Sequence, residues 1–284
     1  VLNYNETTES TGIETTESGH TDPQTLTTEN LGWKILGIGE NGRLELISDN
    51  ATTATVTLVG ETGYLNGKNV LNRVCDDLYG KGQYAKGARC IKAEDINKLA
   101  NYNPETSIEY GDLYKFKFDT NANCIQYSKS TDEGATWSEW ENMQEVTGTG
   151  KPYETFKIPG STETLSKDNL KTSEEIKNTY YALIQIANEI SDTNIANMIT
   201  KGTGDSNISY WLNTPTTMCM PNFVIFGMPT VRGGNIASFD MGGAPLYGAD
   251  GTSYNQSFSI RPVVTLEPDV QLKGSSQEGW TLSK

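Results

Sequence analysis

The chain has 284 residues, and its 36 acidic side chains outnumber its 22 basic ones, for a formal net charge of −14. Proteins bind nucleic acids and anionic lipids through basic clusters, so this balance argues against both as partners. No run approaches the roughly 18 consecutive apolar residues of a membrane helix, and no charged-then-apolar leader stands at the start, so we expect a soluble chain.

The first 60 residues suggest a polar segment followed by strands. Residues 1–30 begin with the strand-like VLNYN and continue as a Thr/Glu/Ser-rich run, with no lysine or arginine before Lys34. Such a composition buries little and predicts an exposed loop or tether. Residues 33–48 form two apolar runs around Asn41-Gly42, a dipeptide that favours tight turns, so they predict a β-hairpin. A β-branched strand follows and ends at Gly60.

Two helices are predicted before residue 102. Between Asn66 and Tyr79 the apolar residues recur at helical spacing, and Gly80 ends the segment. The apolar positions are Val70, Leu71, Val74, Cys75, Leu78 and Tyr79. A shorter helix is expected over residues 93–100.

Residues 111–142 alternate with period two, which predicts a small antiparallel sheet. Ser130 to Trp137 fit the Asp-box pattern S-x-D-x-G-x-T-W, in which aspartate oxygens hold the turn backbone and the tryptophan packs under the hairpin. It occurs once, so we interpret it as a turn and not as a propeller repeat. Residues 119–123 imitate the start of a calcium loop but lack its glycine and glutamate, so they too predict a turn.

The second half begins with helical patterns. Thr172 and Glu175 form a capping box, and apolar residues from Ile176 to Ile190 line one face of a predicted long helix. Asp192 is expected to cap a short helix that continues to Ile199. From residue 210 to 272 the sequence is rich in Gly, Asn and Ser, which predicts short strands and long ordered loops.

The residues available for chemistry are few. The only histidine is His20, which removes most Ser–His, Cys–His and multi-histidine metal sites. The four cysteines form no CxxC pair, so we favour unpaired thiols, with a Cys75–Cys90 disulfide as the alternative. No carboxylate pair stands out for glycoside hydrolysis. We therefore predict no enzyme, no metal and no cofactor.

Two C-terminal segments carry a family resemblance. Tyr210 to Pro215 (YWLNTP) and Ser259 to Leu266 (SIRPVVTL) resemble the C-terminal half of C-type-lectin-like domains of the formylglycine-generating-enzyme type. Pieces of uncharacterised surface or pilin-like proteins of anaerobic bacteria and their phages look like residues 33–37, 44–48, 71–79, 88–89 and 94–96. The resemblance covers roughly residues 31–100 and 205–284. The fold is shared with variable proteins of diversity-generating retroelements, whose exposed loops bind ligand.

This resemblance implies an α+β fold, a C-type-lectin-like mixed core with two or three helices and an inserted small antiparallel sheet. The strand at Trp33 and the run 258–266 should then lie in one sheet. The expected division is a strand plus acidic Thr-rich loop or tether (1–30), the N-terminal half of the core (31–102), the inserted sheet with its Asp-box turn (103–165), and a helix with the C-terminal half of the core (166–284).

We predict a non-enzymatic recognition or adhesion module, displayed outside the cell, on the cell surface or on a phage virion. Its loops 216–256 would bind a host-cell receptor, glycan or surface protein by aromatic stacking and hydrogen bonding, with Arg232 as the cation. The expected ligand-binding residues are Asn222, Phe223, Phe226, Arg232, Asn235, Tyr247, Tyr254 and Asn255. The alternative is a self-assembling subunit of a pilin-like filament or a phage virion or tail, in which VLNYN adds to a neighbour's sheet.

Overall fold

The computed structural model describes the chain except for residues 1, 5–6, 40, 103–111, 120, 123, 144–154, 161–163, 167–180, 184–185, 188, 221–222, 238–242 and 276–277. It is β-rich, with 43% strand and 19% helix, and its described residues form four α-helices and many small sheets. The expected α+β class with a C-type-lectin-like core is therefore wrong. Gly- and Asn-rich segments that carry no strong periodicity form many of the strands.

The largest sheet has seven strands and joins the two ends of the sequence. In spatial order these are β22 (Gln271–Ser275), β23 (Gly279–Ser283), β1 (Leu2–Asn3), β4 (Trp33–Ile38), β5 (Leu44–Ser48), β21 (Pro262–Leu266) and β7 (Ala85–Cys90). Strand β4 pairs with β5, and β5 pairs with β21, so the predicted sharing of one sheet is confirmed for β21. The hairpin β4–β5 is confirmed as well.

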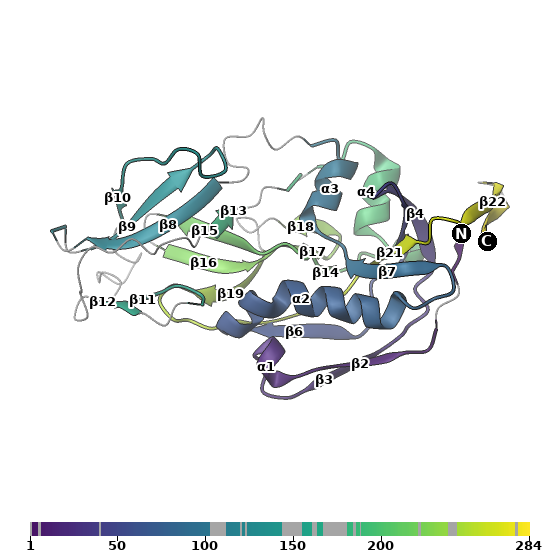
Figure 1. The fold of residues 1–284 in the computed structure, drawn as a ribbon, viewed down its shortest axis with the longest axis horizontal. Coiled ribbons are helices and arrows are strands. Elements are labelled where there is room, and N and C mark those ends of the chain that lie inside the picture. Colours follow the sequence, from purple (N-terminus) through teal and green to yellow (C-terminus); the bar gives the residue numbers. More distant parts are fainter. Residues whose placement is uncertain are drawn as a thin grey trace.

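The N-terminal strand completes its own sheet. Strand β1 runs parallel to β23 on one side and antiparallel to β4 on the other. Tyr4, just after it, is buried and donates its hydroxyl to the Tyr79 carbonyl at 2.6 Å. Strand β1 therefore has strand partners on both sides within its own chain. Figure 1 shows both termini together beside β22, at the opposite end of the molecule from β8, β9 and β10.

Two further sheets contain the segment expected to be irregular. A five-stranded sheet has the order β18 (Asn235–Ala237), β17 (Thr230–Arg232), β14 (Tyr210–Trp211), β20 (Asn255–Ser259) and β6 (Thr55–Val59). A three-stranded sheet has the order β15 (Thr216–Met220), β16 (Phe223–Met228) and β19 (Ala244–Gly248). The run 258–266 is thus divided between two sheets, because its first two residues belong to β20.

Helix α2 (Gly60–Tyr79) lies along β6 and β7 (Figure 1) and buries the predicted apolar stripe. It begins six residues before the predicted start, at Gly60, whose φ of 60° favours glycine. A Cβ at Gly63 would meet the Leu58 carbonyl carbon at 3.0 Å, so the helix and β6 are in close contact there. Asp76 and Asn72 accept hydrogen bonds from the backbone N–H groups of Ala88 and Cys90, and so cover the outer edge of β7.

The expectation of an exposed loop or tether over residues 1–30 is wrong. This segment contains β2 (Ser10–Ile13), α1 (Thr15–Ser18) and β3 (Gln24–Thr27). Strand β2 and helix α1 pack against α2, and β3 pairs with β2. Ile13 is fully buried, and Arg73 of α2 pairs with Glu17 at 2.9 Å. The acidic composition of the segment suggested exposure because no basic residue stands nearby in the sequence. Its partner, Arg73, lies about 50 residues further along the chain.

The sheet predicted over residues 111–142 is present but larger. Its order is β10 (Glu141–Asn142), β9 (Cys124–Ser130), β8 (Asp112–Asp119) and β13 (Tyr181–Leu183), so it recruits a strand from beyond residue 165. Phe116 of β8 lies 5.2 Å from the Phe156 ring, in the same hydrophobic cluster as Trp211. Phe156 belongs to β11 (Thr155–Lys157), which pairs with β12 (Thr164–Ser166).

Both predicted turns of this sheet are confirmed. Asp132 accepts hydrogen bonds from the Thr136 backbone and hydroxyl at 2.8 and 2.6 Å, as the Asp-box pattern indicates. Asp119 accepts from the N–H groups of Asn121 and Ala122, which makes the calcium-like segment an ordinary turn.

Two shorter helices contribute to a second hydrophobic cluster, which includes Ile96, Ile199, Tyr210 and Val263. Helix α3 (Ala93–Leu99) and helix α4 (Thr193–Thr200) agree with the predictions, and Asp192 caps α4. A 3-10 turn follows α4 at Thr203–Asp205. Of the predicted helix over 172–190, residues 172–180 lie outside the described part, and residues 181–183 are strand β13, so the prediction is wrong there.

Candidate functional site

The predicted ligand-binding residues are divided between core and surface. Phe226 and Tyr247 are 0% and 3% exposed, and their rings stack with centroids 6.3 Å apart. Neither offers a ring to an external ligand in this structure, which corrects that expectation. The reason is tertiary, because the three-stranded sheet turns this face toward Tyr64 of α2. Phe223 is half-buried, and Asn222 lies outside the described residues.

Two of the remaining residues are neighbours at one end of the five-stranded sheet, and a third lies toward the same end. Arg232 is directly opposite Asn235 in the β17–β18 pair. Strand β14 joins β17 and β20, since Tyr210 pairs with both Val231 and Ser259. Because β14 is antiparallel to β17 and parallel to β20, the last residue of β17 and the first of β20 share an end. Asn255 therefore lies toward the same end as Arg232 and Asn235, but three residues beyond Phe258, the residue of β20 that is level with Arg232. All three residues are exposed.

Arg232 is held by an aromatic ring. Its guanidinium carbon lies 5.5 Å from the centroid of Phe258, within cation–π range. Phe258 is buried and packs edge-on against Trp211 at 5.0 Å. No described carboxylate lies within 4.0 Å of the guanidinium, so in the described part of the chain this cation is oriented but not neutralised. Tyr254, half-buried, immediately precedes Asn255.

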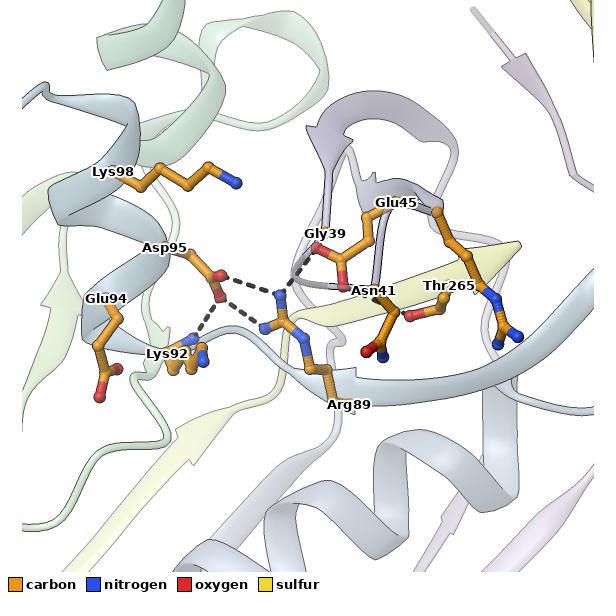
Figure 2. A pocket seen from close by; sticks show the side chains of 10 residues that line it. Gly39, Asn41, Glu45, Arg89, Lys92, Glu94, Asp95, Lys98 and Thr265 are labelled. Carbon is orange, nitrogen blue, oxygen red and sulfur yellow. Dashed lines mark hydrogen bonds and ion pairs between the residues drawn. The ribbon is translucent and has the colours of Figure 1, made fainter. Parts of the chain in front are cut away.

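A second polar site is a cleft between the β4–β5 hairpin and α3 (Figure 2). Its volume is about 240 Å³. The lining combines basic and acidic side chains with small polar groups: Gly39, Asn41, Arg43, Glu45, Arg89, Lys92, Glu94, Asp95, Lys98 and Thr265. None of these residues was predicted as a site.

The floor of the cleft is an ion-pair network centred on Arg89. Its guanidinium donates to both oxygens of Asp95 at 2.6 and 2.9 Å and to Glu45 at 3.0 Å (Figure 2). Burial alone would lower the pKa of Arg89, but hydrogen bonds and charge from Asp95, and then Glu45, raise it above its ordinary value. Asp95 also accepts the Lys92 backbone N–H. Arg89 is thus a fixed cation and not a proton donor.

The described residues offer little for metal or thiol chemistry. They contain no group of three or more His, Cys, Asp or Glu that could hold a metal ion. All four cysteines are free thiols, so the Cys75–Cys90 disulfide left open by the sequence is absent from the described chain. Burial, followed by the neighbouring Cys90, raises the pKa of the Cys75 thiol well above its usual value, which disfavours a thiolate nucleophile.

Comparison of the chain with protein-family models, with curated proteins and with solved structures gives no match. The described helices include none that is both long and apolar enough to cross a membrane. The sequence signal that could have located the cleft was local, because Glu94 and Asp95 open a helix six residues or fewer after Arg89. The opposite wall of the cleft, the β4–β5 hairpin, gives no such local signal, because only strand pairing within the seven-stranded sheet brings it beside Arg89.

Proposed function

We propose that this protein is a non-enzymatic recognition module that binds a receptor, glycan or surface protein through the exposed end of its five-stranded sheet. We name this surface, formed by Arg232, Asn235, Tyr254 and Asn255, the sheet-end surface. We propose that the module is displayed on the cell surface, in the extracellular space or on a phage virion.

The main support for the proposal is that the Arg232 guanidinium is oriented by an aromatic ring and is not paired with a described carboxylate. An exposed arginine normally samples many rotamers, and ordering it costs binding free energy. Here the Phe258 ring 5.5 Å away restricts the guanidinium before any ligand arrives. Since no described carboxylate pairs with it, its donors are available to a ligand acid or hydroxyl group. The site therefore suits a partner that presents an anionic or strongly polar group.

Other residues toward the same end of the sheet supply neutral contacts. Asn235 and Asn255 are exposed amides that donate and accept hydrogen bonds, and Tyr254 adds a partly exposed ring. The combination of one oriented cation, amides and an aromatic ring is suited to carbohydrate or protein surfaces, where many weak polar contacts add to one anchor. The filament or virion subunit receives no support from β1, which is paired on both sides within its own chain.

The proposal can be tested by screening the purified chain against arrays of neutral glycans, acidic glycans and host surface proteins. We expect at least one specific binder. Arg232→Ala should weaken that interaction about ten-fold or more, and Arg232→Lys should restore only part of it. Lys273→Ala, on exposed β22, is the matched control and should bind like the wild type. Equal binding by Arg232→Ala and the wild type would contradict the proposal.

A further inference from the structure

The sequence contains two Asn-Gly dipeptides, and the fold places them in opposite environments. They are Asn41-Gly42, between β4 and β5, and Asn66-Gly67, inside α2. An asparagine followed by glycine is chemically labile, because glycine has no Cβ to keep its backbone nitrogen away from the asparagine side chain. The two sites therefore allow the same chemistry to be compared in one chain.

Asn41 and Gly42 lie at the exposed tip of the β4–β5 hairpin. Both residues are exposed, and a Cβ added to Gly42 would meet nothing within 4 Å apart from its own chain neighbours. The Gly42 N–H donates to the Gly39 carbonyl at 3.0 Å within the turn. Opening this bond leaves the strand pairing, which begins at Ile38 and Leu44, intact. Local openings of this kind cost little free energy, so the Gly42 nitrogen is accessible in the folded chain.

Asn66 and Gly67, in contrast, are enclosed by α2 and its neighbours. Inside a helix each backbone N–H is bonded to the carbonyl four residues earlier. Gly67 is buried, and a Cβ there would meet Leu58 Cδ1 at 2.9 Å and Met228 Sδ at 3.2 Å. The Asn66 amide donates to the Thr16 carbonyl at 3.4 Å. Attack by the Gly67 nitrogen therefore requires α2 to unwind, which is a much larger opening than that of an exposed turn.

We propose that Asn41 is a site of spontaneous deamidation in the folded protein. The Gly42 backbone nitrogen bonds to the side-chain carbonyl carbon of Asn41, and the bond from that carbon to Nδ2 breaks. The Asn41 nitrogen leaves as ammonia and takes up the proton that the Gly42 nitrogen loses. Water then opens the cyclic imide at either carbonyl, which gives aspartate or isoaspartate. One water is consumed and one ammonia is released, so the conversion needs no oxidant or reductant.

The product changes the cleft between the hairpin and α3, because Asn41 belongs to its lining (Figure 2). Conversion of the neutral amide to a carboxylate adds one negative charge to a lining that contains both acidic and basic side chains. Isoaspartate also adds a methylene group to the backbone at the tip of the hairpin. The modification therefore alters the charge of this wall and the path of its backbone.

The test is to incubate the purified full chain in warm, mildly alkaline buffer and to follow the peptides that contain Asn41 and Asn66 by mass spectrometry. Deamidation replaces NH with O, and the fragmentation method should distinguish aspartate from isoaspartate. We expect conversion at Asn41 to be about a hundred-fold or more faster than at Asn66 in the folded chain. In urea that unfolds the chain, the two sites should convert at similar rates, because only the fold separates them.

Variants make the assignment specific. Asn41→Gln should abolish the early mass increase of the folded chain, since glutamine must close a larger ring that forms more slowly. Asn66→Gln is the matched control and should leave that increase unchanged, with circular dichroism confirming that both variants are folded. The proposal is overturned if Asn41 stays intact in the folded chain over a period in which the unfolded chain converts. It is also overturned if Asn66 converts as fast as Asn41 in the folded chain, or if Asn41→Gln keeps the early mass increase.

Discussion

Arg261 donates a hydrogen bond to the Tyr210 hydroxyl at 3.2 Å while its guanidinium carbon lies 5.2 Å from the Tyr210 ring centroid, and both side chains are fully buried. The same guanidinium donates to the carbonyls of Ser48, Met198 and Ile199. It thus joins the end of β5 to the last turn of α4, where the helix dipole favours a cation. The arginine of the sequence RPVV is therefore a structural centre and not a ligand contact.

Replacing Arg261 should be strongly destabilising. Arg261→Met leaves several buried carbonyls without donors, so we expect the free energy of unfolding to fall by about 3–5 kcal/mol. Urea denaturation would measure this loss. Arg232→Met, at an exposed position, should change the unfolding free energy by less than about 0.5 kcal/mol. A similar effect for both variants would contradict the role assigned to Arg261.

The Asp-box turn should have a visible acid titration. The side-chain hydrogen bond from Thr136, then its backbone N–H and the Ser130 hydroxyl, lower the pKa of Asp132 to about 2. Because this pKa is lowered on folding, the carboxylate stabilises the turn above the unfolded pKa of about 3.9, and that contribution is lost as the pH falls toward 2. Carboxyl-carbon NMR should give a midpoint near 2. Thr136→Val should move it upward, and an ordinary midpoint in the wild type would refute the assignment.

The sheet containing β8 and β9 should unfold together with the rest of the chain. Phe116 is 1% exposed and contacts Phe156 within the main hydrophobic cluster. Phe116→Ala should therefore cost about 3–5 kcal/mol and lower the midpoint of a single transition. Trp137 is only half-buried, with Lys115 above its ring at 4.4 Å, so Trp137→Ala should cost less. Calorimetry that resolves a separate transition for this sheet would show that it is an independent unit.

Close contact between α2 and β6 makes two glycines respond differently to alanine. Alanine normally favours a helix by about 1 kcal/mol over glycine. At Gly63 the new Cβ would lie 3.0 Å from the Leu58 carbonyl carbon and 3.1 Å from the Ser18 carbonyl oxygen, both backbone atoms. Gly63→Ala should therefore destabilise the protein by about 1–3 kcal/mol. At Gly67 the closest atoms are the ends of flexible side chains, so Gly67→Ala should be nearly neutral in thermal unfolding.

Local patterns predicted the elements with strong periodicity. The hairpin at residues 33–48 is predicted by its turn dipeptide, and the helix ending at Tyr79 is predicted by its apolar stripe. Each pattern lies within a single segment of the chain. The strands between residues 216 and 248 gave only weak local signals. Residues 10–27 are held in place partly by Asp77 and Arg73 of α2, which bind Thr11 and Glu17. These partners lie more than 50 residues away in the sequence, so no local pattern reveals them.

The candidate sites depend even more on tertiary structure. Phe226 and Tyr247 look like ligand residues by composition, and only the packing of their sheet on α2 shows that they are buried. Arg232 was predicted as a contact, but its position over Phe258 requires β14 between two strands distant in sequence. The cleft requires β21 to place β5 beside β7, so that Glu45 and Arg89 meet.

The most direct test of the recognition proposal is to map which residues a bound ligand perturbs. Amide shifts of the isotope-labelled protein should be recorded while the specific glycan or a soluble receptor fragment from the array screen is added. The account predicts that the largest changes fall at residues 230–236 and 254–258, and that Arg232→Ala abolishes them. Saturable changes centred on the cleft, or on residues outside the five-stranded sheet, would contradict it.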